Sequence, residues 1–378
     1  MKVAIAGCIH GDVERMYKVL ESIENEQDCK VDLLLCCGDF QAVRDERDLE
    51  SMTRTKDYHD LGTFHKYYNG ESTAPVLTIF IGGNHEASKY LQELPFGGWV
   101  APNIYYLGYA GCVNINGLRI GGISGIYKKY NYRRCHHEFP PYTEDSKRSV
   151  YHVRELEVFR LKQISGKIDI FMSHDWPRNI DKFGDEMTPA DLISIKPDFE
   201  SDIKNNCLGS PANKEILDRL QPSYWAAAHL HCRFSAEVPH SNSMKTKFLA
   251  LDKAVNDSIE RKFIEILDID VEPKECPLSY DLEWLTILHN TQHLVTGKQK
   301  FNSMPKENGS VRWNFTPTSE EKESILSKFD DDLIVPTNFC RTEKSVLNGK
   351  PQSNPQTLKF CGTLNVDDPL CIAMAEIN

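Results

Sequence analysis

The sequence lacks three features, each of which would define a broad class of protein. No stretch of its 378 residues approaches the roughly 20 consecutive apolar residues of a membrane-spanning helix. We therefore expect no membrane partner. The start, Met1–Gly7, is too short for a signal sequence. Twelve cysteines are scattered without the close spacing of a disulfide framework, which favours a reducing compartment, cytosol or nucleus.

Overall positive charge is also missing, since the formal net charge is −11. Proteins that bind nucleic acids usually carry a basic surface. Residues 127–154 are an exception, with a net charge of +4 and interleaved aromatic residues. Cations contact phosphates and aromatic rings stack on bases, so this stretch fits single-stranded RNA. Taken alone, the stretch is better explained as a solvated loop with ordinary aromatic packing, and only a phosphoesterase centre beside it would favour RNA binding. The candidate RNA contacts are Lys128, Lys129, Tyr132, Arg133 and Arg134.

Five short motifs carry most of the functional signal, and each follows an apolar run typical of a buried strand. In α/β sheets, sites form beyond the strand ends, so five such endings can face one crevice. The motifs are Gly7-Cys8-Ile9-His10-Gly11-Asp12, Cys37-Gly38-Asp39-Phe40, Gly82-Gly83-Asn84-His85-Glu86, Ser173-His174-Asp175-Trp176-Pro177 and His229-Leu230-His231.

These motifs supply more donor atoms than one tetrahedral metal ion can accept. The set fits two ions that share a bridging carboxylate, roughly 3.5–4 Å apart. Asp39 is the natural bridge, because it is the only acid among the candidates. Cys8 could instead be a buried structural thiol, and Asp175 could orient a ligand or cap a turn. The candidate metal ligands are Cys8, His10, Asp39, Asn84, His174, His229 and His231, with His85 in reserve.

The order of the motifs resembles the calcineurin-like metallophosphoesterase superfamily: D-x-H, G-D, G-N-H-E, a lone His and G-H-x-H. The resemblance covers residues 1–231. Cys8 stands where most of the superfamily has Asp, and Ala228 stands where the last motif usually has Gly. That cysteine, the segment Cys36–Arg44 and the run Leu94–Gly108 narrow the resemblance to the RNA lariat debranching branch of the superfamily.

The resemblance implies a division of the ligands between two divalent metals. Cys8, His10 and His231 would hold one metal with Asp39. Asn84, His174 and His229 would hold the other, again with Asp39, and His85 would be the acid beside the leaving group. Imidazole with thiolate suits zinc or ferrous iron, and carboxylate with amide also admits manganese. The family favours Fe(II) and Zn(II).

The resemblance further implies hydrolysis of the 2′–5′ phosphodiester bond at the branchpoint of excised intron lariat RNA. It identifies residues 125–155 as the lariat recognition loop. The expected partner is branched RNA and not DNA, and the expected state is a monomer in the nucleus that could shuttle to the cytoplasm. Two alternatives stay open: another nuclease or phosphodiesterase of the superfamily, and a non-catalytic scaffold of the same fold.

For the fold we predict an α/β (α+β) architecture, the four-layer αββα sandwich of two mixed sheets flanked by helices. We assign 1–267 to the catalytic domain and 268–378 to a smaller C-terminal extension that is partly mobile, notably at 345–357. Apolar spacing and turn residues predict the helices and strands. The expected helices include Val13–Glu24, Tyr58–Tyr68, Val150–Ile164, Asp281–Gln292 and Thr318–Phe329.

Overall fold

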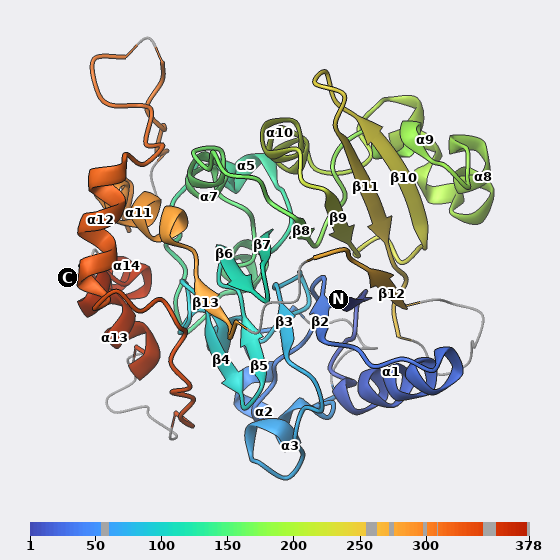
Figure 1. Ribbon diagram of the computed structural model, residues 1–378, viewed down its shortest axis with the longest axis horizontal. Coiled ribbons are helices and arrows are strands. Elements are labelled where there is room, and N and C mark those ends of the chain that lie inside the picture. Colours follow the sequence, from blue (N-terminus) through green and yellow to red (C-terminus); the bar gives the residue numbers. More distant parts are fainter. Residues whose placement is uncertain are drawn as a thin grey trace.

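The structure is a computed structural model in which helices surround a stack of β-sheets (Figure 1). None of the helices in the described parts of the chain combines the length and the apolar character that a membrane crossing requires. The structure describes residues 1–53, 60–254, 263–271, 276–297, 301–307, 309–342 and 353–375.

The first sheet has the strand order β12-β1-β2-β3-β5-β4. Strands β1, β2, β3 and β5 run parallel, and β12 and β4 pair antiparallel at the two edges. The parallel strands end at the same edge of the sheet, next to the first three motifs. The strands are β1 (Lys2–Ala6), β2 (Leu33–Cys36), β3 (Thr78–Phe80), β4 (Gly98–Ala101), β5 (Ile104–Tyr106) and β12 (Ile264–Asp268).

The second sheet has the order β10-β11-β9-β8-β7-β6-β13. Its central strands β11, β9, β8 and β7 are parallel, and β8 and β9 lead into the last two motifs. The strands are β6 (Ala110–Ile115), β7 (Leu118–Ile123), β8 (Ile170–Ser173), β9 (Tyr224–Ala227), β10 (Phe234–Pro239), β11 (Lys245–Ala250) and β13 (Ser279–Tyr280).

The two sheets pack face to face, and helices cover their outer faces. Val3 and Ile5 of β1 share one apolar cluster with Ile170 and Met172 of β8. Because side chains alternate along a strand, Ala4 and Ala6 of β1 face the opposite side of the sheet, where they share an apolar cluster with helix α1. Helices α7, α10 and α11 contribute to the cluster on the outer face of the second sheet. This arrangement confirms the predicted αββα sandwich.

Helix α1 (Val13–Gln27) begins where the sequence predicts, because the Asp12 side chain accepts a hydrogen bond from the Arg15 backbone N–H. The expected helix at 58–68 begins only at Phe64, and residues 54–59 lie outside the described residues. The remaining α-helices are α2 (Glu46–Leu49), α3 (Phe64–Tyr68), α4 (Ser88–Leu91), α5 (Lys129–Tyr132), α6 (Glu144–Ser149), α7 (Glu155–Leu161), α8 (Pro189–Ile195), α9 (Glu200–Lys204), α10 (Pro211–Leu220), α11 (Leu282–Asn290), α12 (Ser319–Lys328), α13 (Pro355–Leu364) and α14 (Pro369–Ala375). Short 3-10 turns lie at Ile180–Phe183, Pro197–Phe199 and Gln292–Leu294.

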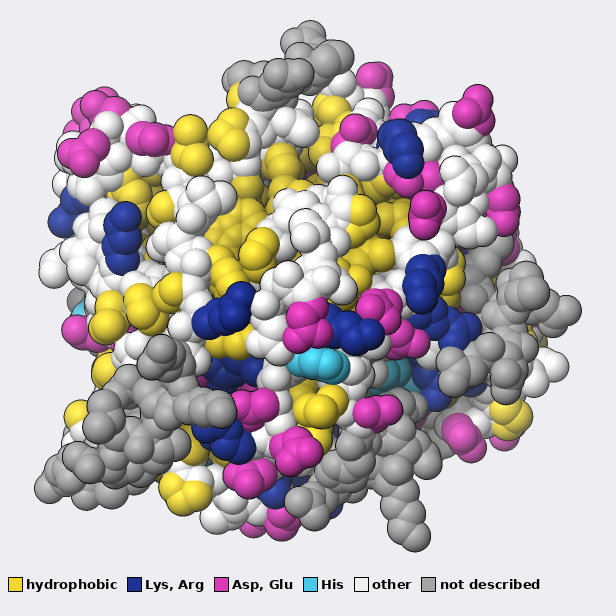
Figure 2. Space-filling view, turned by 90° about the horizontal axis from the view of Figure 1, so that it is seen from below, with side chains coloured by type: hydrophobic (Ala, Val, Ile, Leu, Met, Phe, Trp, Pro, Cys, Tyr) yellow, Lys and Arg dark blue, Asp and Glu magenta, His cyan; other side chains and the backbone are white. Residues whose placement is uncertain are grey.

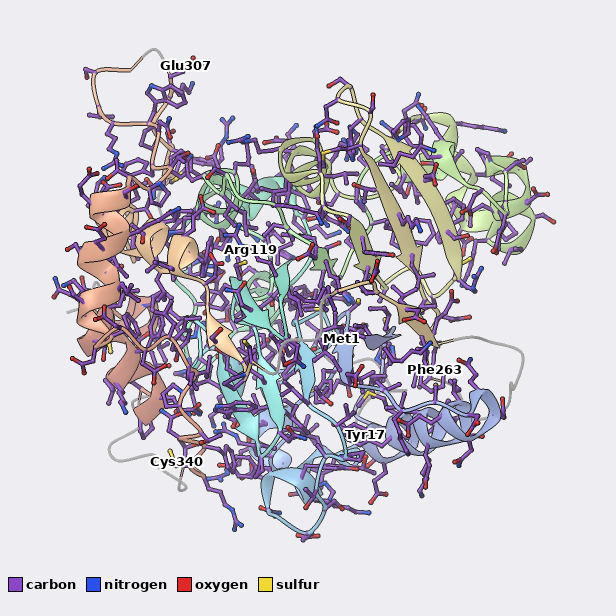
Figure 3. The ribbon with its side chains drawn as sticks, in the orientation of Figure 1. Met1, Tyr17, Arg119, Phe263, Glu307 and Cys340 are labelled. Atoms are coloured by element: carbon purple, nitrogen blue, oxygen red, sulfur yellow. The ribbon has the colours of Figure 1, made fainter. Side chains whose placement is uncertain are left out.

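The C-terminal part of the chain is joined to the second sheet. Strand β13 pairs with β6, and the Arg119 guanidinium donates to Asp281 at 2.7 Å and to Glu283 at 2.8 Å. Figure 3 shows Arg119 inside the molecule and Glu307 at the tip of a projecting loop. Of the stretch expected to be mobile, 345–352 lies outside the described residues and α13 begins at Pro355.

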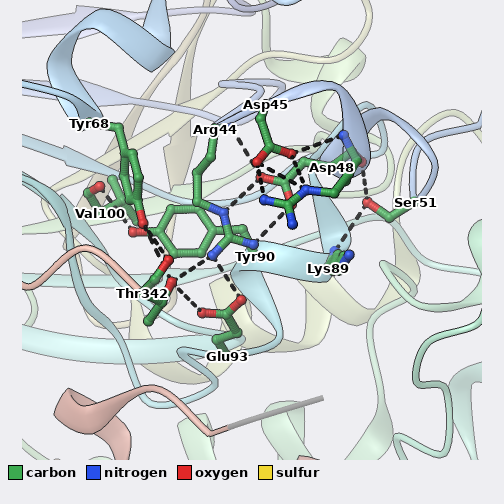
Figure 4. A network of polar contacts seen from close by, with 11 residues as sticks. Arg44, Asp45, Asp48, Ser51, Tyr68, Lys89, Tyr90, Glu93, Val100 and Thr342 are labelled. Carbon is green, nitrogen blue, oxygen red and sulfur yellow. Dashed lines mark hydrogen bonds and ion pairs between the residues drawn. The ribbon is translucent and has the colours of Figure 1, made fainter. Parts of the chain in front are cut away.

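A second network ties this part of the chain to the loop after β2 (Figure 4). The Arg44 guanidinium contacts Asp48 at 2.8 Å and Glu93 at 2.9 Å, and it also donates to the Thr342 hydroxyl at 2.8 Å. Arg44 lies over the ring of Tyr90, 3.9 Å from its centre. The division at residue 267 stays a prediction, although these contacts join the two parts closely.

Candidate metal centre

The five motifs meet at one place, because the strands that precede them end together. Their turns are also bonded to one another. The His10 N–H donates to the Asp39 carbonyl at 2.7 Å, which joins the first motif to the second. The Ala228 N–H donates to the His174 carbonyl at 3.0 Å, which joins the fourth to the fifth. These backbone hydrogen bonds therefore fix the relative positions of donor side chains that lie far apart in the sequence.

One donor group consists of Cys8, His10, Asp39 and His231, whose potential ligand atoms all lie within 4.8 Å of one another. Burial lowers the pKa of His10 to about 4 and that of His231 to about 3. Neutral imidazole is the form that binds metals. Burial also raises the pKa of the Cys8 thiol well above its usual range, so its thiolate needs a nearby cation.

A second donor group forms around His174. Its Nε2 lies 3.2 Å from Asn84 Oδ1 and 3.3 Å from Asp39 Oδ1, and its ring centre lies 4.8 Å from that of His229. The His174 Nδ1–H donates to the Cys37 carbonyl at 2.8 Å. That bond points Nε2 toward the two oxygens. Burial would lower the pKa of His174, but the Asp39 carboxylate beside Nε2 raises it. Three potential ligand atoms therefore converge on one point, where a metal cation could take the place of the proton.

Asp39 lies between the two groups. Its Oδ2 is 4.0 Å from His10 Nε2, whereas its Oδ1 is 3.3 Å from His174 Nε2. Burial would raise the pKa of Asp39, but the neighbouring histidines hold that pKa well below its usual range. An ionised carboxylate with one oxygen toward each group is the arrangement that a bridging ligand requires.

The backbone at this site is strained. Four of the candidate donors have a positive backbone φ, between 48° and 63°, a conformation that residues other than glycine rarely adopt. They are His10, Asp39, His229 and His231. Each such residue costs about 1–3 kcal/mol, and strain of this kind concentrates at functional sites. Gly83 allows the chains to approach closely, since a Cβ there would lie 2.2 Å from Asp39 Oδ1.

His85 lies beside the two groups rather than within them. Its ring centre is 5.6 Å from that of His10, and its backbone N–H donates to Asp39 Oδ1 at 2.7 Å. The side chain is half-buried. This position leaves the imidazole able to reach a group bound at the centre.

Two residues at the site were not singled out from the sequence. The buried Glu86 carboxylate accepts hydrogen bonds from the backbone N–H groups of Phe40, Gln41 and Gly83, at 2.6, 2.8 and 3.2 Å. It thereby ties the second motif to the third. The Gln41 side-chain amide lies 3.3 Å from His10 Nδ1 and orients that ring. The position of Glu86 directly after Asn84 and His85 in the third motif was the one sequence feature that could have indicated its place at the site.

Asp175 was left open between two roles. Its carboxylate accepts a hydrogen bond from the Trp176 N–H at 2.8 Å, so it caps its own turn. Burial raises the pKa of Asp175 to about 6.

The loop 125–155 begins beside the centre, where the Gly125 N–H donates to the Gly82 carbonyl at 2.8 Å. Lys128, Lys129 and Arg133 are exposed, and Arg134 is half-buried. The ring of Tyr132 packs partly against the core beside Tyr127, with ring centres 5.2 Å apart. Figure 2 shows the molecule from below the view of Figure 1, and on this face basic and acidic side chains are interspersed.

Arg154, counted among the basic residues of this stretch, is only 1% exposed. Its guanidinium donates to Glu138 Oε1 at 2.7 Å and to the carbonyls of Asn131 and Ser149, each at 2.9 Å. It therefore holds three points of the loop together from inside and does not face a ligand. Its burial could not be read from charge alone.

Sequence comparisons agree with the fold. Residues 1–233 match the calcineurin-like phosphoesterase family, and residues 243–369 match the C-terminal domain of lariat debranching enzyme. A lariat debranching enzyme of Drosophila pseudoobscura pseudoobscura is 51% identical, over 99% of this chain and 78% of its own length. The human enzyme is 49% identical over 97% of this chain and 70% of its own. The Arabidopsis thaliana enzyme is 43% identical, with 97% and 86% covered.

The sandwich of two sheets and its clustered donors are therefore those of a calcineurin-like phosphoesterase, a class of metal-dependent proteins. Within that class, the chain belongs to the lariat debranching enzyme family.

Proposed function

We propose that this protein is a metal-dependent phosphodiesterase that hydrolyses the 2′–5′ bond at the branchpoint of excised intron lariat RNA. The observation that carries the proposal is Asp39, whose two oxygens face two separate groups of donors in a chain of this family. Branched RNA is the substrate that the family name implies. The reaction would leave a linear RNA that keeps its 5′-phosphate.

The donor atoms fit two divalent ions. Cys8, His10 and His231 would hold one together with Asp39, and the group around His174 would hold the other. Divalent ions bound there would activate water and neutralise charge on the phosphate. A thiolate beside imidazoles favours Fe(II) or Zn(II), and the amide of Asn84 keeps Mn(II) acceptable.

The protein's own groups position the reaction. Glu86 and the Cys37 carbonyl fix the turns and rings that present the donors. His85 stands beside both groups and donates a proton to the departing 2′-oxygen, a task that typically contributes about 10²–10⁴-fold to the rate. The exposed cations Lys128, Lys129 and Arg133 would contact the RNA backbone.

The test compares a synthetic branched RNA, a linear RNA of the same length and cyclic nucleotides as substrates. Wild-type protein prepared without oxygen should cleave the branched RNA selectively. Asp39→Ala should lose both activity and metal, because it removes the shared ligand. Equal cleavage of linear RNA would indicate another nuclease of the class, and absence of all hydrolysis would indicate a scaffold.

Oligomeric state and location follow from the same proposal. We expect a monomer that acts in the nucleus, where excised introns arise. Sedimentation of the metal-loaded protein and imaging of a tagged full-length chain test the two points separately.

A further inference from the structure

The C-terminal part of the chain reaches the recognition loop through a short pairing of backbones. Phe301 forms an antiparallel bridge with Arg134, and the Asn302 N–H donates to the Arg133 carbonyl at 2.7 Å. The Asn302 side chain also donates to the Leu294 carbonyl at 2.8 Å. These bonds fix the position of Phe301 against the basic loop, although the two segments are far apart in the sequence.

Two large aromatic side chains stand out from this surface. Phe301 is 73% exposed, and Tyr130 in helix α5 is 82% exposed. Tyr130 lies between Lys129 and Arg133 in the chain, and the Arg133 side chain is 66% exposed. Other aromatic rings of the loop, such as that of Tyr132, pack partly against the core. Exposed rings of this size beside cations are the composition of a single-stranded RNA surface.

The surface begins next to the metal centre. The loop that carries it starts at Gly125, whose N–H donates to the carbonyl of Gly82, two residues before Asn84, at 2.8 Å. From Lys128 the chain continues into α5 and then to Arg134, where the C-terminal segment pairs with it. The loop also contains a hollow of about 600 Å³, lined in part by Arg134 and Arg148.

We propose that Phe301, together with Tyr130, forms a stacking surface for the unpaired nucleotides that flank the branchpoint. This inference rests on the proposed function, and it assigns an RNA-binding role to the C-terminal part of the chain. The cations beside the rings hold phosphates, and the rings stack on bases without reading their identity. Phe301 pairs with Arg134, nine residues along the loop from Gly125 beside the centre, so it would contact nucleotides beyond the cleaved bond.

The experiment compares Phe301→Ala with wild type on two branched RNAs, a minimal branched trinucleotide and one with arms of several nucleotides. Loss of one stacked base should weaken binding of the longer RNA by about 5- to 150-fold. Cleavage of the trinucleotide and of a small chromogenic phosphodiester should be unchanged. Phe301→Trp should restore binding of the longer RNA, because an indole ring also stacks.

Leu358→Ala is the matched control, since Leu358 is a 56% exposed apolar residue on helix α13 of the same C-terminal part. Its binding of both RNAs should equal that of wild type. Unchanged binding of the longer RNA by Phe301→Ala overturns the inference and leaves a protein partner as the occupant of the surface. Equal losses on the small ester and the long RNA would make Phe301 structural, which also overturns it.

The proposed function can fail separately. If wild-type protein cleaves no branched RNA, the reaction is misassigned. Binding of linear single-stranded RNA by fluorescence anisotropy, in wild type and Phe301→Ala, still decides whether the surface stacks on bases.

Discussion

At the scale of single residues, groups that hold no metal determine how the donors are presented. The Cys37 carbonyl sets the tautomer of His174, and Glu86 fixes two of the donor turns. The sequence could indicate the candidate donors, because each follows a strand and belongs to a motif with a chemical reason for its residue types. The sequence could not show the importance of Glu86, because the three groups that Glu86 binds are backbone N–H groups that only folding brings close to it.

The assignment of Cys8 as a metal ligand can be separated from a structural role. Cys8→Ser should weaken zinc or iron binding at the group containing His10 far more than at the group containing His174, because serine does not supply a thiolate. Cys37→Ser is the matched control, since the Cys37 thiol is as buried as that of Cys8 and lies in the same apolar cluster but is not in the group of four converging donors. Metal titration with elemental analysis measures both. Equal affinities in the two variants and wild type would make Cys8 a core residue.

If His85 is the general acid and not a ligand, removing its imidazole should lower activity but leave the metals bound. His85→Ala should keep both metals and lower kcat by about 10²–10⁴-fold, the usual contribution of a general acid. His240→Ala should change neither quantity, because His240 follows the end of β10 and its Nε2 lies 2.8 Å from the Thr246 hydroxyl rather than among the donors. Single-turnover cleavage of branched RNA and metal content are measured together. Loss of metal from His85→Ala would place His85 among the ligands instead.

At the scale of elements, the pattern of strands followed by motifs predicted the sheets well. It did not predict which side chains are buried inside the loop 125–155. Charge and aromatic content indicated a loop that faces RNA. They could not show that Arg154 is buried or that His136 lies flat against Tyr109, with ring centres 4.0 Å apart. Such positions depend on contacts between residues distant in the chain, which no local pattern encodes.

The buried pair of Arg154 and Glu138 gives a prediction about the loop as a unit. Burial alone would raise the pKa of Glu138, but Arg154 and nearby histidines hold it at about 2. Arg154→Met leaves that carboxylate buried without its main partner, a change that costs about 3–5 kcal/mol. We expect KM for branched RNA to rise while hydrolysis of a small phosphodiester survives.

Two further variants distinguish this effect from general damage. Lys162→Met removes an exposed ion pair with Glu215 and should change stability by less than about 1 kcal/mol. The double variant Arg154→Met with Glu138→Gln should recover part of the lost stability, because no buried charge is left unpaired. A parallel fall of small-ester hydrolysis in Arg154→Met would show that the loop also supports the metal centre.

At the scale of the whole molecule, the C-terminal part is built into the sandwich. It supplies the edge strand β13 and part of the core on helix α11, and Thr342 bonds to Arg44 in the loop after β2. From the sequence, residues 268–378 were expected to form a separate, smaller extension. Composition does not show which residues the apolar side chains of a segment will contact. It therefore could not predict how extensively the C-terminal part packs against the rest of the chain.

Unfolding measures whether the two parts act as one unit. Arg119 is mostly buried between Asp281 and Glu283, so Arg119→Met leaves two carboxylates without their cation. Breaking a buried pair in this way typically costs about 3–5 kcal/mol. We expect the melting temperature to fall while unfolding stays a single transition, with circular dichroism and tryptophan fluorescence giving the same midpoint. The fluorescence follows Trp284 in α11 as well as Trp176 and Trp225 near the second sheet. Two separated transitions would instead mean that the C-terminal part unfolds alone, and that its contacts with the sheet add little to the stability of the catalytic sandwich.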